Sequence, residues 1–402
     1  MHVSSLLRRT LGLKGHKVKK VTVCGGEIKA QLAARKGSRP ICSSCGRKMP
    51  GYDSLRERSW RHVPLWGIPV TLVYRPRRGK CPRCGIVVEK MSWSAGKSTL
   101  SVPLIVLLAT YARILPFEEV ARLFSCHWNT VRSAVASAVS FGLAHRDTGG
   151  VTAIGIDEIA RRKGHRYLTM VYDLSCMRLL WCGEGRDKAA LRAFFSGLSK
   201  EEKEAIRVVC CDMWQPYLEV VEEEVPGATL VFDKFHLVRH LLGAVDEVRR
   251  EEARELKDKD PEVLKRTRYI FLKNPENLTE GQRARLSDLE KLNLRINRAY
   301  LLKEAFRSLW DYRHPAWAES YLDQWVWWAT HSRLKPMRDF AWLVKRHKEG
   351  ILNYFRARVT NASVEGMNRK AKVVSQRAYG YKSVPAFQLA LYHVLGQSSS
   401  AK

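Results

Sequence analysis

Three acidic residues far apart in the chain have the sequence surroundings of ligands for a divalent cation. Asp157 ends the apolar run Ala153-Ile-Gly-Ile, and Asp212 ends a second such run, Val208-Val-Cys-Cys. Glu365 lies in the first turns of an expected helix rich in Arg and Lys. A lone carboxylate at the end of a buried strand is unfavourable, but a hard cation shared with further carboxylates makes it favourable. The pattern therefore predicts a two-metal phosphoryl-transfer site.

In such a site we expect Asp157 to bridge the two ions, and Asp212 and Glu365 each to complete the shell of one. The ions would be Mg²⁺ or Mn²⁺, two per active site, because a hard cation of this kind accepts few protein carboxylates. Taken singly, each acid would more commonly be a surface or capping carboxylate. Three basic residues share the expected Glu365 helix and are candidate phosphate contacts that position a strand without reading its sequence: Arg369, Lys370 and Lys372.

Four of the ten cysteines form two Cys-x-x-Cys-Gly knuckles, and the members are Cys42, Cys45, Cys81 and Cys84. Each knuckle can give two thiolates to one tetrahedral zinc ion, and a four-cysteine shell is closed, so the zinc is structural. The alternative, four free thiols, is less favoured in a reducing compartment. The gap between the pairs is long for a zinc ribbon, so we expect an inserted hairpin around Trp66-Gly67.

The charge of the chain favours a polyanionic partner. Lys and Arg number 70 against 40 Asp and Glu among 402 residues, which gives a formal net charge of +30. These basic residues recur along the whole chain, which points to nucleic acid over a small acidic substrate. We expect no secretory signal and no membrane span, and hence a cytoplasmic, nucleoid-associated bacterial protein.

The segment 98–148 reads as a helix-turn-helix. An apolar helix over Ser101–Leu115 precedes a short amphipathic one from Phe117, a turn at Ser125-Cys-His, and a second helix rich in Ala and Val. The start of this last helix offers four residues for base contacts: Trp128, Asn129, Thr130 and Arg132. A plain helical hairpin has the same pattern and remains an alternative.

Beyond Gly149-Gly150 the expected order is a three-stranded meander, helix, strand, helix, strand. This order is typical of a ribonuclease-H-like fold, and it places Asp157 and Asp212 on neighbouring strands. From Lys234 to about Gly350 the pattern is helical, too long for a loop, so a helical insertion is expected. Most of its tryptophans, between Trp310 and Trp342, are expected in its core, and one or two, not individually identified, are candidates for stacking on DNA bases.

The fold class is therefore a multidomain α+β chain. We expect the following parts: 1–97, an N-terminal zinc-ribbon domain; 98–148, a helix-turn-helix; 149–245, the first part of an RNase-H-like α/β catalytic core; 246–350, an α-helical insertion domain; and 351–397, the final part of the core with Glu365.

With these residues in place, the chain resembles the DDE transposases of bacterial insertion sequences, specifically the ISL3 family. The resemblance is carried by segments in fixed order: Arg61-His-Val-Pro-Leu-Trp-Gly, Trp128-Asn-Thr-Val, Ile154-Gly-Ile-Asp-Glu, Asp212-Met-Trp-Gln-Pro-Tyr, Val231-Phe-Asp-Lys-Phe-His and Asn361-Ala-Ser-Val-Glu-Gly-Met-Asn-Arg-Lys. It implies a DDE triad of Asp157, Asp212 and Glu365, and an accessory element formed by Asp233 and His236.

The resemblance implies a transposase that binds terminal inverted repeats and carries out metal-dependent strand cleavage and strand transfer. Its partners would be double-stranded DNA, as transposon ends and target, and further copies of the chain in a dimer or larger assembly. Two alternatives remain open: a catalytically inactive, domesticated transposase-derived DNA-binding regulator, and a nuclease of the same fold that joins nothing.

Overall fold

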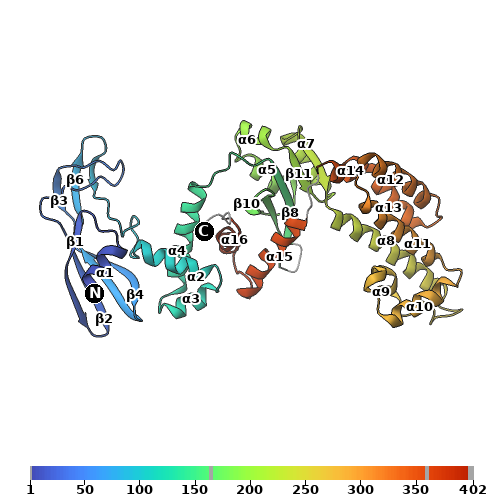
Figure 1. Cartoon of the computed structure of the whole chain (residues 1–402), viewed down its shortest axis with the longest axis horizontal. Helices are drawn as coiled ribbons and strands as arrows, with labels where there is room; N and C mark the ends of the chain where they lie inside the picture. Colours follow the sequence, from blue (N-terminus) through green and yellow to red (C-terminus); the bar gives the residue numbers. More distant parts are fainter. Residues whose placement is uncertain (1, 163–165, 358–361, 397–402) are drawn as a thin grey trace. The chain divides into compact units, whose positions relative to one another are not determined.

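The computed structural model describes residues 2–162, 166–357 and 362–396, and these residues form two compact units (Figure 1). Unit 1 contains Met1–Arg146 together with Arg377–Tyr381 and Pro385–Val394. Unit 2 contains Asp147–Gln376 and two short C-terminal pieces. In the described part of the chain, no helix is long and apolar enough to cross a membrane.

Unit 1 begins with a sheet in the order β1-β2-β5-β4. Its elements are β1 (His16–Cys24), β2 (Glu27–Ala34), β4 (Arg58–Leu65) and β5 (Ile68–Tyr74), preceded by helix α1 (Val3–Thr10). Alternate residues of β2 and β5 are buried in a core with Leu7 and Trp60, as expected of strands with one covered face. The hairpin expected as an insertion in the ribbon is β4–β5. It pairs with β2, so it belongs to this sheet.

A second, smaller sheet of unit 1, ordered β3-β6-β7, holds the cysteine knuckles. Its strands are β3 (Gly51–Ser54), β6 (Arg77–Cys81) and β7 (Gly85–Val88). Gly46 and Gly85, which directly follow the two cysteine pairs, have φ of +74° and +75°, a conformation that glycine adopts without strain. Apart from the cysteines, the buried core of this sheet contains only Met49 among the residues that the structure describes. A core this small gives the ribbon little stability of its own.

Glu89, just after β7, is the centre of a buried polar network that connects the ribbon with the larger sheet. Its carboxylate accepts hydrogen bonds from Tyr74 Oη at 2.6 Å, from the Arg77 backbone N–H at 2.9 Å and from the Arg77 guanidinium at 2.7 and 3.0 Å. His16 Nε2 lies 3.4 Å away. Burial alone raises the pKa of Glu89, but the contacts with His16, Arg77 and Tyr74 outweigh it and lower the pKa to about 2.

This network predicts that Glu89→Gln destabilises unit 1. A carboxyl pKa lowered from 4.5 to about 2 corresponds to a contribution on the order of 3 kcal/mol. Because the folded-state pKa lies below the unfolded one, the contribution is fully present above about pH 4.5 and is lost as the pH falls through about 2. Denaturant unfolding of wild type and variant at several pH values measures it. Asp53→Asn, at an exposed pair with Arg78, is the control and should change stability by less than about 1 kcal/mol.

The helices that follow in unit 1 are α2 (Val102–Ala112), α3 (Phe117–Leu123) and α4 (Trp128–Ala144). Ser101 caps α2 by accepting a hydrogen bond from the backbone of Leu104, and α2 ends three residues earlier than expected. The C-terminal helix α16 (Val384–Leu395) packs on this group, since Leu389 and Tyr392 contact its core and His393 Nε2 donates to the carbonyl of Ala109 at 2.7 Å. The sequence placed all of 351–397 together with Glu365, whereas Pro385–Val394 of α16 lies in unit 1.

Unit 2 contains a five-stranded mixed sheet in the order β10-β9-β8-β11-β12. Its strands are β8 (Ala153–Arg162), β9 (Arg166–Asp173), β10 (Arg178–Glu184), β11 (Val208–Cys211) and β12 (Thr229–Phe232). The first three form an antiparallel meander, as expected, and β11 lies parallel between β8 and β12. The predicted adjacency of the strands that lead to Asp157 and Asp212 is confirmed.

Helices cover both faces of this sheet (Figure 1). Those between the strands are α5 (Lys188–Phe195), α6 (Lys200–Ala205) and α7 (Gln215–Glu224). The core on the α5 and α7 face is built from alternate strand residues, including Ile154, Ile156 and Cys211. On the other face, a Cβ at Gly155 would overlap Val364 of helix α15 (Ala362–Arg377), so the absence of a side chain at Gly155 lets α15 lie directly on β8.

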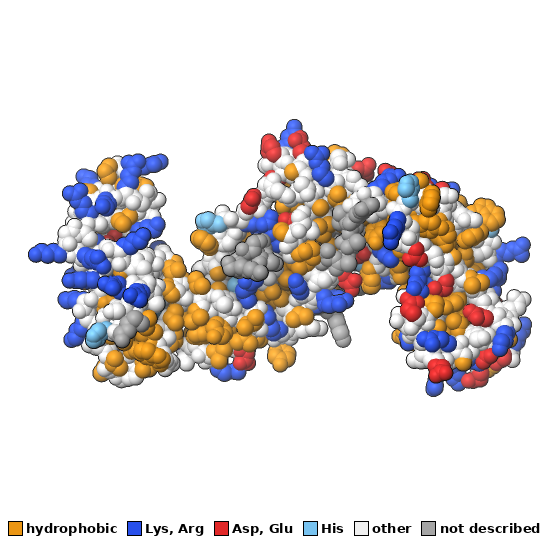
Figure 2. All heavy atoms as spheres, viewed as in Figure 1, with side chains coloured by type: hydrophobic (Ala, Val, Ile, Leu, Met, Phe, Trp, Pro, Cys, Tyr) orange, Lys and Arg blue, Asp and Glu red, His pale blue; other side chains and the backbone are white. Residues whose placement is uncertain are grey.

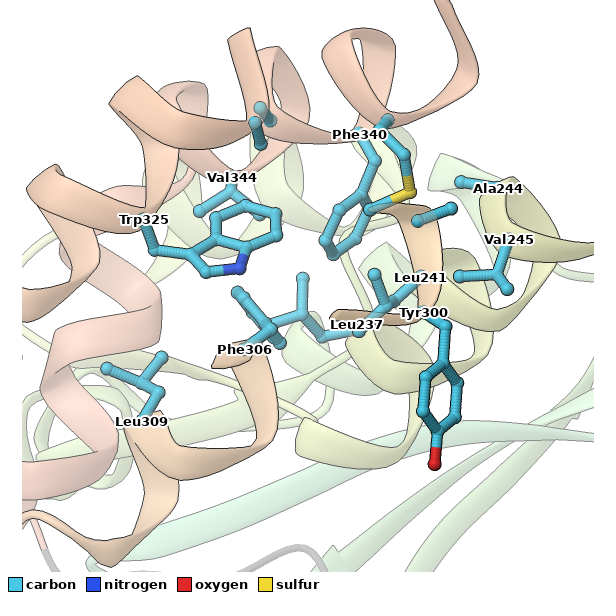
Figure 3. Packing of buried hydrophobic residues seen from close by; sticks show 14 of the residues in the cluster. Leu237, Leu241, Ala244, Val245, Tyr300, Phe306, Leu309, Trp325, Phe340 and Val344 are labelled. Carbon is cyan, nitrogen blue, oxygen red and sulfur yellow. The ribbon is translucent and has the colours of Figure 1, made fainter. Parts of the chain in front are cut away.

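The helical region after β12 has its own core. Its helices are α8 (Lys234–Glu255), α9 (Arg268–Leu272), α10 (Glu280–Glu290), α11 (Arg295–Arg307), α12 (Pro315–Thr330), α13 (Lys335–Arg346) and α14 (Lys348–Ala357). Figure 3 shows Trp325, Phe306 and Phe340 gathered at its centre, where their rings meet edge to face. Helix α8 is continuous across the expected boundary between residues 245 and 246, and α14 packs on β12.

The tryptophans of this region correct the expectation from sequence. Trp325 is fully buried and its Nε1 donates to the carbonyl of Leu302 at 2.9 Å. In contrast, Trp317, Trp327 and Trp342 are 68%, 59% and 50% exposed. Residues 325 and 327 point to different sides because successive residues of a helix are separated by about 100°. Most tryptophans of this region therefore lie outside the core that Trp325 helps to form.

Candidate functional site

Asp157, Asp212 and Asp233 lie at one level on three adjacent strands. Gly155 is paired with Cys210 in the parallel β8–β11 ladder, and Cys211 with Phe232 in the β11–β12 ladder. Asp157 lies two residues after Gly155, and Asp212 lies two residues after Cys210. Asp233 directly follows Phe232. The register thus leads to Asp157, Asp212 and Asp233 at corresponding positions of neighbouring strands, just beyond the last paired residues of the parallel ladders.

Asp157 faces α15. Residues at alternate positions of β8 point to opposite faces, and since Ile154 and Ile156 face the α5 and α7 core, Gly155 and Asp157 face the other side. The sequence suggested that this strand ends at Asp157, but it does not. It runs on to Arg162 in its ladder with β9, and only the pairing with β11 ends, at Gly155. The loss of this neighbour opens space beside Asp157 that a loop or a ligand can use.

The Asp157 carboxylate is half-buried and both of its oxygens accept hydrogen bonds. The backbone N–H of Glu158 donates to Oδ1 at 2.7 Å, and Asn368 Nδ2, from α15, donates to Oδ2. Burial raises the pKa of Asp157 to about 7, and the negative charges of Glu158 and Asp233 add to this, while the Glu158 N–H and His236 oppose it. A carboxyl group with so high a pKa lacks a compensating positive charge.

Asp212 and Asp233 both lie against His236, which sits in the first turn of α8. Nδ1 of His236 is 3.4 Å from Asp212 Oδ2 and 3.5 Å from Asp233 Oδ2, and this buried nitrogen has no hydrogen-bond partner. Asp233 caps α8 by accepting from the backbone of Phe235 at 2.8 Å. Arg239 Nη2 approaches Asp212 at 3.9 Å. Of the expected accessory pair Asp233 and His236, the histidine thus lies within 3.5 Å of both Asp212 and Asp233.

Glu365 lies in the first turn of α15 and is exposed. Its carboxylate pairs with Arg369 at 3.0 Å, one turn further along the helix. Asn368, three positions after Glu365 on α15, donates a hydrogen bond to Asp157. Lys370 and Lys372 are exposed on the same helix.

Asn368 is a contact that sequence reasoning missed. It is 7% exposed, and its Oδ1 accepts from Tyr172 Oη of β9 at 2.7 Å. Because an ionised carboxylate only accepts hydrogen bonds, Asp157 takes the Nδ2 group of Asn368, and the amide oxygen is left to accept from the tyrosine hydroxyl. Its position one helical turn from Glu365 in Glu-x-x-Asn was the available signal.

We expect Asn368→Ala to lower metal affinity at Asp157, or activity that depends on the metal, by about 10- to 100-fold, the usual effect of removing a residue that orients a ligand. Titration with Mn²⁺ measures it independently of turnover. Tyr172→Phe keeps Asn368 but frees its amide to rotate, so it should give a smaller loss in the same direction. An Asn368→Ala variant with unchanged Mn²⁺ affinity would show that the contact is merely structural.

A second group of side chains lies on the opposite side of β8. Glu158 is 3.7 Å from Arg186 Nη1, so it faces away from Asp157, as expected from strand alternation. The Arg186 guanidinium lies over Trp214 at 4.3 Å and over Tyr167 at 5.0 Å from the ring centroids. Trp214 Nε1 donates to the carbonyl of Arg186 at 3.0 Å. These contacts fix the loop that follows Asp212.

The four knuckle cysteines form a compact ligand set in unit 1. The sulfur atoms of Cys42, Cys45, Cys81 and Cys84 all lie within 4.8 Å of one another, and those of Cys45 and Cys81 are 3.5 Å apart. Tetrahedral zinc with Zn–S bonds of about 2.3 Å requires sulfur separations of this size. The donor set therefore fits a structural zinc ion. Among the described residues this is the one set of three or more such ligand atoms that are this close together.

The helix-turn-helix candidates lie at the start of α4. Trp128, Asn129 and Arg132 are exposed and Thr130 is half-buried, while Val131 is buried in the helical core of unit 1. The guanidinium of Arg61, from β4, donates to the carbonyls of Phe124 and Ser125 in the turn before α4. The turn is thus held from outside the helical pair. Figure 2 shows Lys and Arg side chains gathered over the sheets of unit 1 in this view.

Comparison with known proteins gives the family. Residues 154–391 match the ISL3 family of DDE transposases, described as "Transposase", and residues 38–84 match the zinc finger of transposases of IS204, IS1001, IS1096 and IS1165. The transposase for insertion sequence element IS1001 of Bordetella parapertussis is 30% identical over 355 residues, which cover 87% of each chain. The transposase for IS1557 of Mycobacterium tuberculosis is 30% identical over 387 residues, 90% of this chain and 87% of that one.

These matches run through the strands that carry Asp157 and Asp212, through the helical region and through α15, and a separate match covers the cysteine knuckles. The chain belongs to the ISL3 family of insertion-sequence transposases.

Proposed function

We propose that the protein is a DNA transposase that binds terminal inverted repeats and catalyses metal-dependent strand cleavage and strand transfer, with Asp157, Asp212 and Glu365 as its triad. The observation that carries the proposal is the register of the sheet, because it brings Asp157 and Asp212 level on neighbouring strands, on the face against which the Glu365 helix packs. In this reading the sheet of unit 2 is an RNase-H-like catalytic core and the α8–α14 region is its insertion.

The residues present fit a site for divalent cations. The Asp157 carboxyl group lacks a compensating positive charge. Asp212 and Asp233 both lie near Nδ1 of His236, but neither forms a hydrogen bond with this buried nitrogen. Asp157, Asp212 and Glu365 would hold Mg²⁺ or Mn²⁺. The ions would polarise the scissile phosphate and lower the pKa of a nucleophilic oxygen.

The chain's own residues have distinct tasks around this site. Asn368 and the Glu158 N–H orient the two oxygens of Asp157. His236 lies between Asp212 and Asp233 and can donate to either carboxylate. Arg369, Lys370 and Lys372 would hold the phosphates of the strand, since each projects from the helix that carries Glu365.

The N-terminal part of the chain would hold the transposon ends. We infer that α3 and α4 act as a helix-turn-helix, with Trp128, Asn129, Thr130 and Arg132 near the bases, and that the zinc ribbon binds beside it. The formal net charge of +30 supports binding to double-stranded DNA, both transposon ends and target. Since two ends must be processed together, we expect a dimer or a larger assembly on DNA.

The test uses the full-length protein, a duplex that carries one of the inverted repeats flanking the gene, and a supercoiled target plasmid with Mg²⁺ or Mn²⁺. The expected result is a cut at the repeat end and joining of its 3′-hydroxyl to the plasmid, seen as labelled, relaxed plasmid. Cutting without joining would indicate a nuclease. Binding to the repeat without any cutting would indicate a DNA-binding regulator.

A further inference from the structure

The helical region exposes more tryptophan than its stability requires. Trp327 of α12 and Trp342 of α13 are 59% and 50% exposed, although the core beneath them is complete without them. Large aromatic side chains left in water lose the free energy that burial would give them, and adjacent exposed ones mark binding surfaces. Figure 3 shows Trp325 and Phe340 in the core of this region. Trp327 and Trp342 are not part of that core.

The two exposed indoles line one cavity. Trp327 and Trp342 both face a hollow of about 510 Å³ between α12 and α13, together with His331 and Arg338. This volume lies in the usual range of sites for small organic groups, roughly 300–1,000 Å³. The ring of His331 stacks on Trp327, with centroids 4.4 Å apart and planes 26° from parallel, so one wall of the hollow is a flat aromatic surface.

Positive charge surrounds this aromatic surface. The ammonium of Lys345 lies 5.1 Å from the centroid of Trp342. Lys348 neutralises Asp323, the one acidic residue of the lining, at 2.9 Å. In the described part of the chain, neither Arg338 nor Lys345 forms an ion pair. Two cations therefore remain available for an anionic ligand.

Flat aromatic walls with free cations at their rim match the chemistry of a nucleotide, whose base stacks and whose phosphate pairs with Arg or Lys. We propose that this hollow, defined by Trp327, His331, Arg338, Trp342 and Lys345, receives an unpaired nucleotide of DNA. The inference rests on the proposed function only for the choice of DNA as the nucleic acid. An unpaired or flipped base arises where a duplex is opened, as at a strand break.

The alternative occupant is a second copy of this chain. A self-association surface is expected to be apolar at its centre with few free charges. The two unpaired cations at this hollow, on a chain that already carries a net charge of +30, disfavour contact with another copy and favour a polyanion.

The experiment measures binding of the full-length protein to duplexes with a 2-aminopurine, either paired or in an unpaired overhang, in EDTA so that no cleavage occurs. We expect the unpaired base to be quenched on binding. Trp342→Ala and Trp327→Ala should each weaken binding of the overhang duplex by roughly 5- to 100-fold and abolish the quenching. Binding of the fully paired duplex should change little.

Matched variants separate stacking from loss of fold. Trp317→Ala removes a tryptophan that is 68% exposed on the same helix α12 but does not line the hollow, so it should bind as wild type does. Trp342→Phe retains a ring and should recover most of the affinity. Arg338→Gln should weaken binding of both the paired duplex and the overhang duplex. Each of these losses should be smaller than the loss that Trp342→Ala causes with the overhang duplex.

Equal losses in Trp317→Ala and Trp342→Ala, or unchanged quenching in Trp342→Ala, would overturn the inference. So would a change of sedimentation of the DNA-free protein in Trp342→Ala, since this would assign the hollow to a contact between copies. Because the assay involves no cleavage, a protein that fails to join DNA but shows tryptophan-dependent quenching would contradict the proposed function and retain this site.

Discussion

Replacing Asp157 by Asn is expected to abolish strand cleavage while leaving the protein folded and able to bind repeat DNA. The substitution keeps the size of the side chain but removes the negative charge that would hold the cations. Loss of several kcal/mol of metal-derived transition-state stabilisation corresponds to a decrease of about 10³-fold or more in rate. The single-turnover rate of cutting on a repeat-bearing duplex measures it, and filter binding of the same duplex checks that recognition persists.

The contact between Asp157 and Asn368 provides a stringent control. In Asp157→Asn an amide nitrogen can face the Asn368 Nδ2 group, which is also a donor, so some stability should be lost. The double variant with Asp157→Asn and Asn368→Asp restores a donor opposite an acceptor and keeps the total charge. It should regain stability but not cleavage. Cleavage at the wild-type rate by either variant would remove Asp157 from the catalytic site.

Removing zinc is expected to unfold the ribbon around β3, β6 and β7 and to leave the larger sheet of unit 1 folded. The ribbon has almost no apolar core beyond Met49 and the cysteines, whereas the larger sheet has an independent core around Trp60 and Leu72. Structural zinc contributes about 10–16 kcal/mol of apparent binding free energy in small zinc domains, and that free energy is also folding free energy. Without it a ribbon of this size cannot remain folded.

Cys42→Ser and Cys81→Ser should each lower the bound zinc from one ion per chain toward none and remove hydrogen-exchange protection from residues 38–88. Cys24→Ser is the matched control, because Cys24 is exposed and lies outside the four-sulfur cluster. Metal analysis and exchange by mass spectrometry give both readouts. Protection that persists in a zinc-free Cys42→Ser protein would contradict this role for the metal. We also expect weaker binding to the repeat, since the ribbon would no longer present a fixed surface.

Much of the chain could be predicted from local patterns. The strand that leads to Asp212 and the two glycine-terminated knuckles follow from side-chain periodicity and from turn chemistry, which act over a few residues, whereas the end of β8 at Arg162 did not. The adjacency of β8 and β11 was predicted from the order of elements, which is typical of a ribonuclease-H-like fold, and the structure adds that the two strands are parallel.

Other features required the tertiary structure. The position of α16 in unit 1 depends on contacts such as that of His393 with Ala109, two residues that lie 284 positions apart in the sequence. Nothing in the sequence distinguishes Glu89 from the other acidic residues, whereas in the folded protein Tyr74 and Arg77 both donate hydrogen bonds to its carboxylate. Periodicity shows that a face is apolar but does not identify the side chain that it meets.

The sequence by itself determined which residue types are available for chemistry: the paired cysteines, the acids that follow apolar strands and the excess of positive charge. Only the tertiary structure decided which of them touch. In the folded protein Asn368 contacts Asp157. On helix α12, Trp325 is buried whereas Trp327 is exposed. The physical reason is that composition and local periodicity are properties of the chain, whereas burial and hydrogen-bond partners depend on which distant segments pack together.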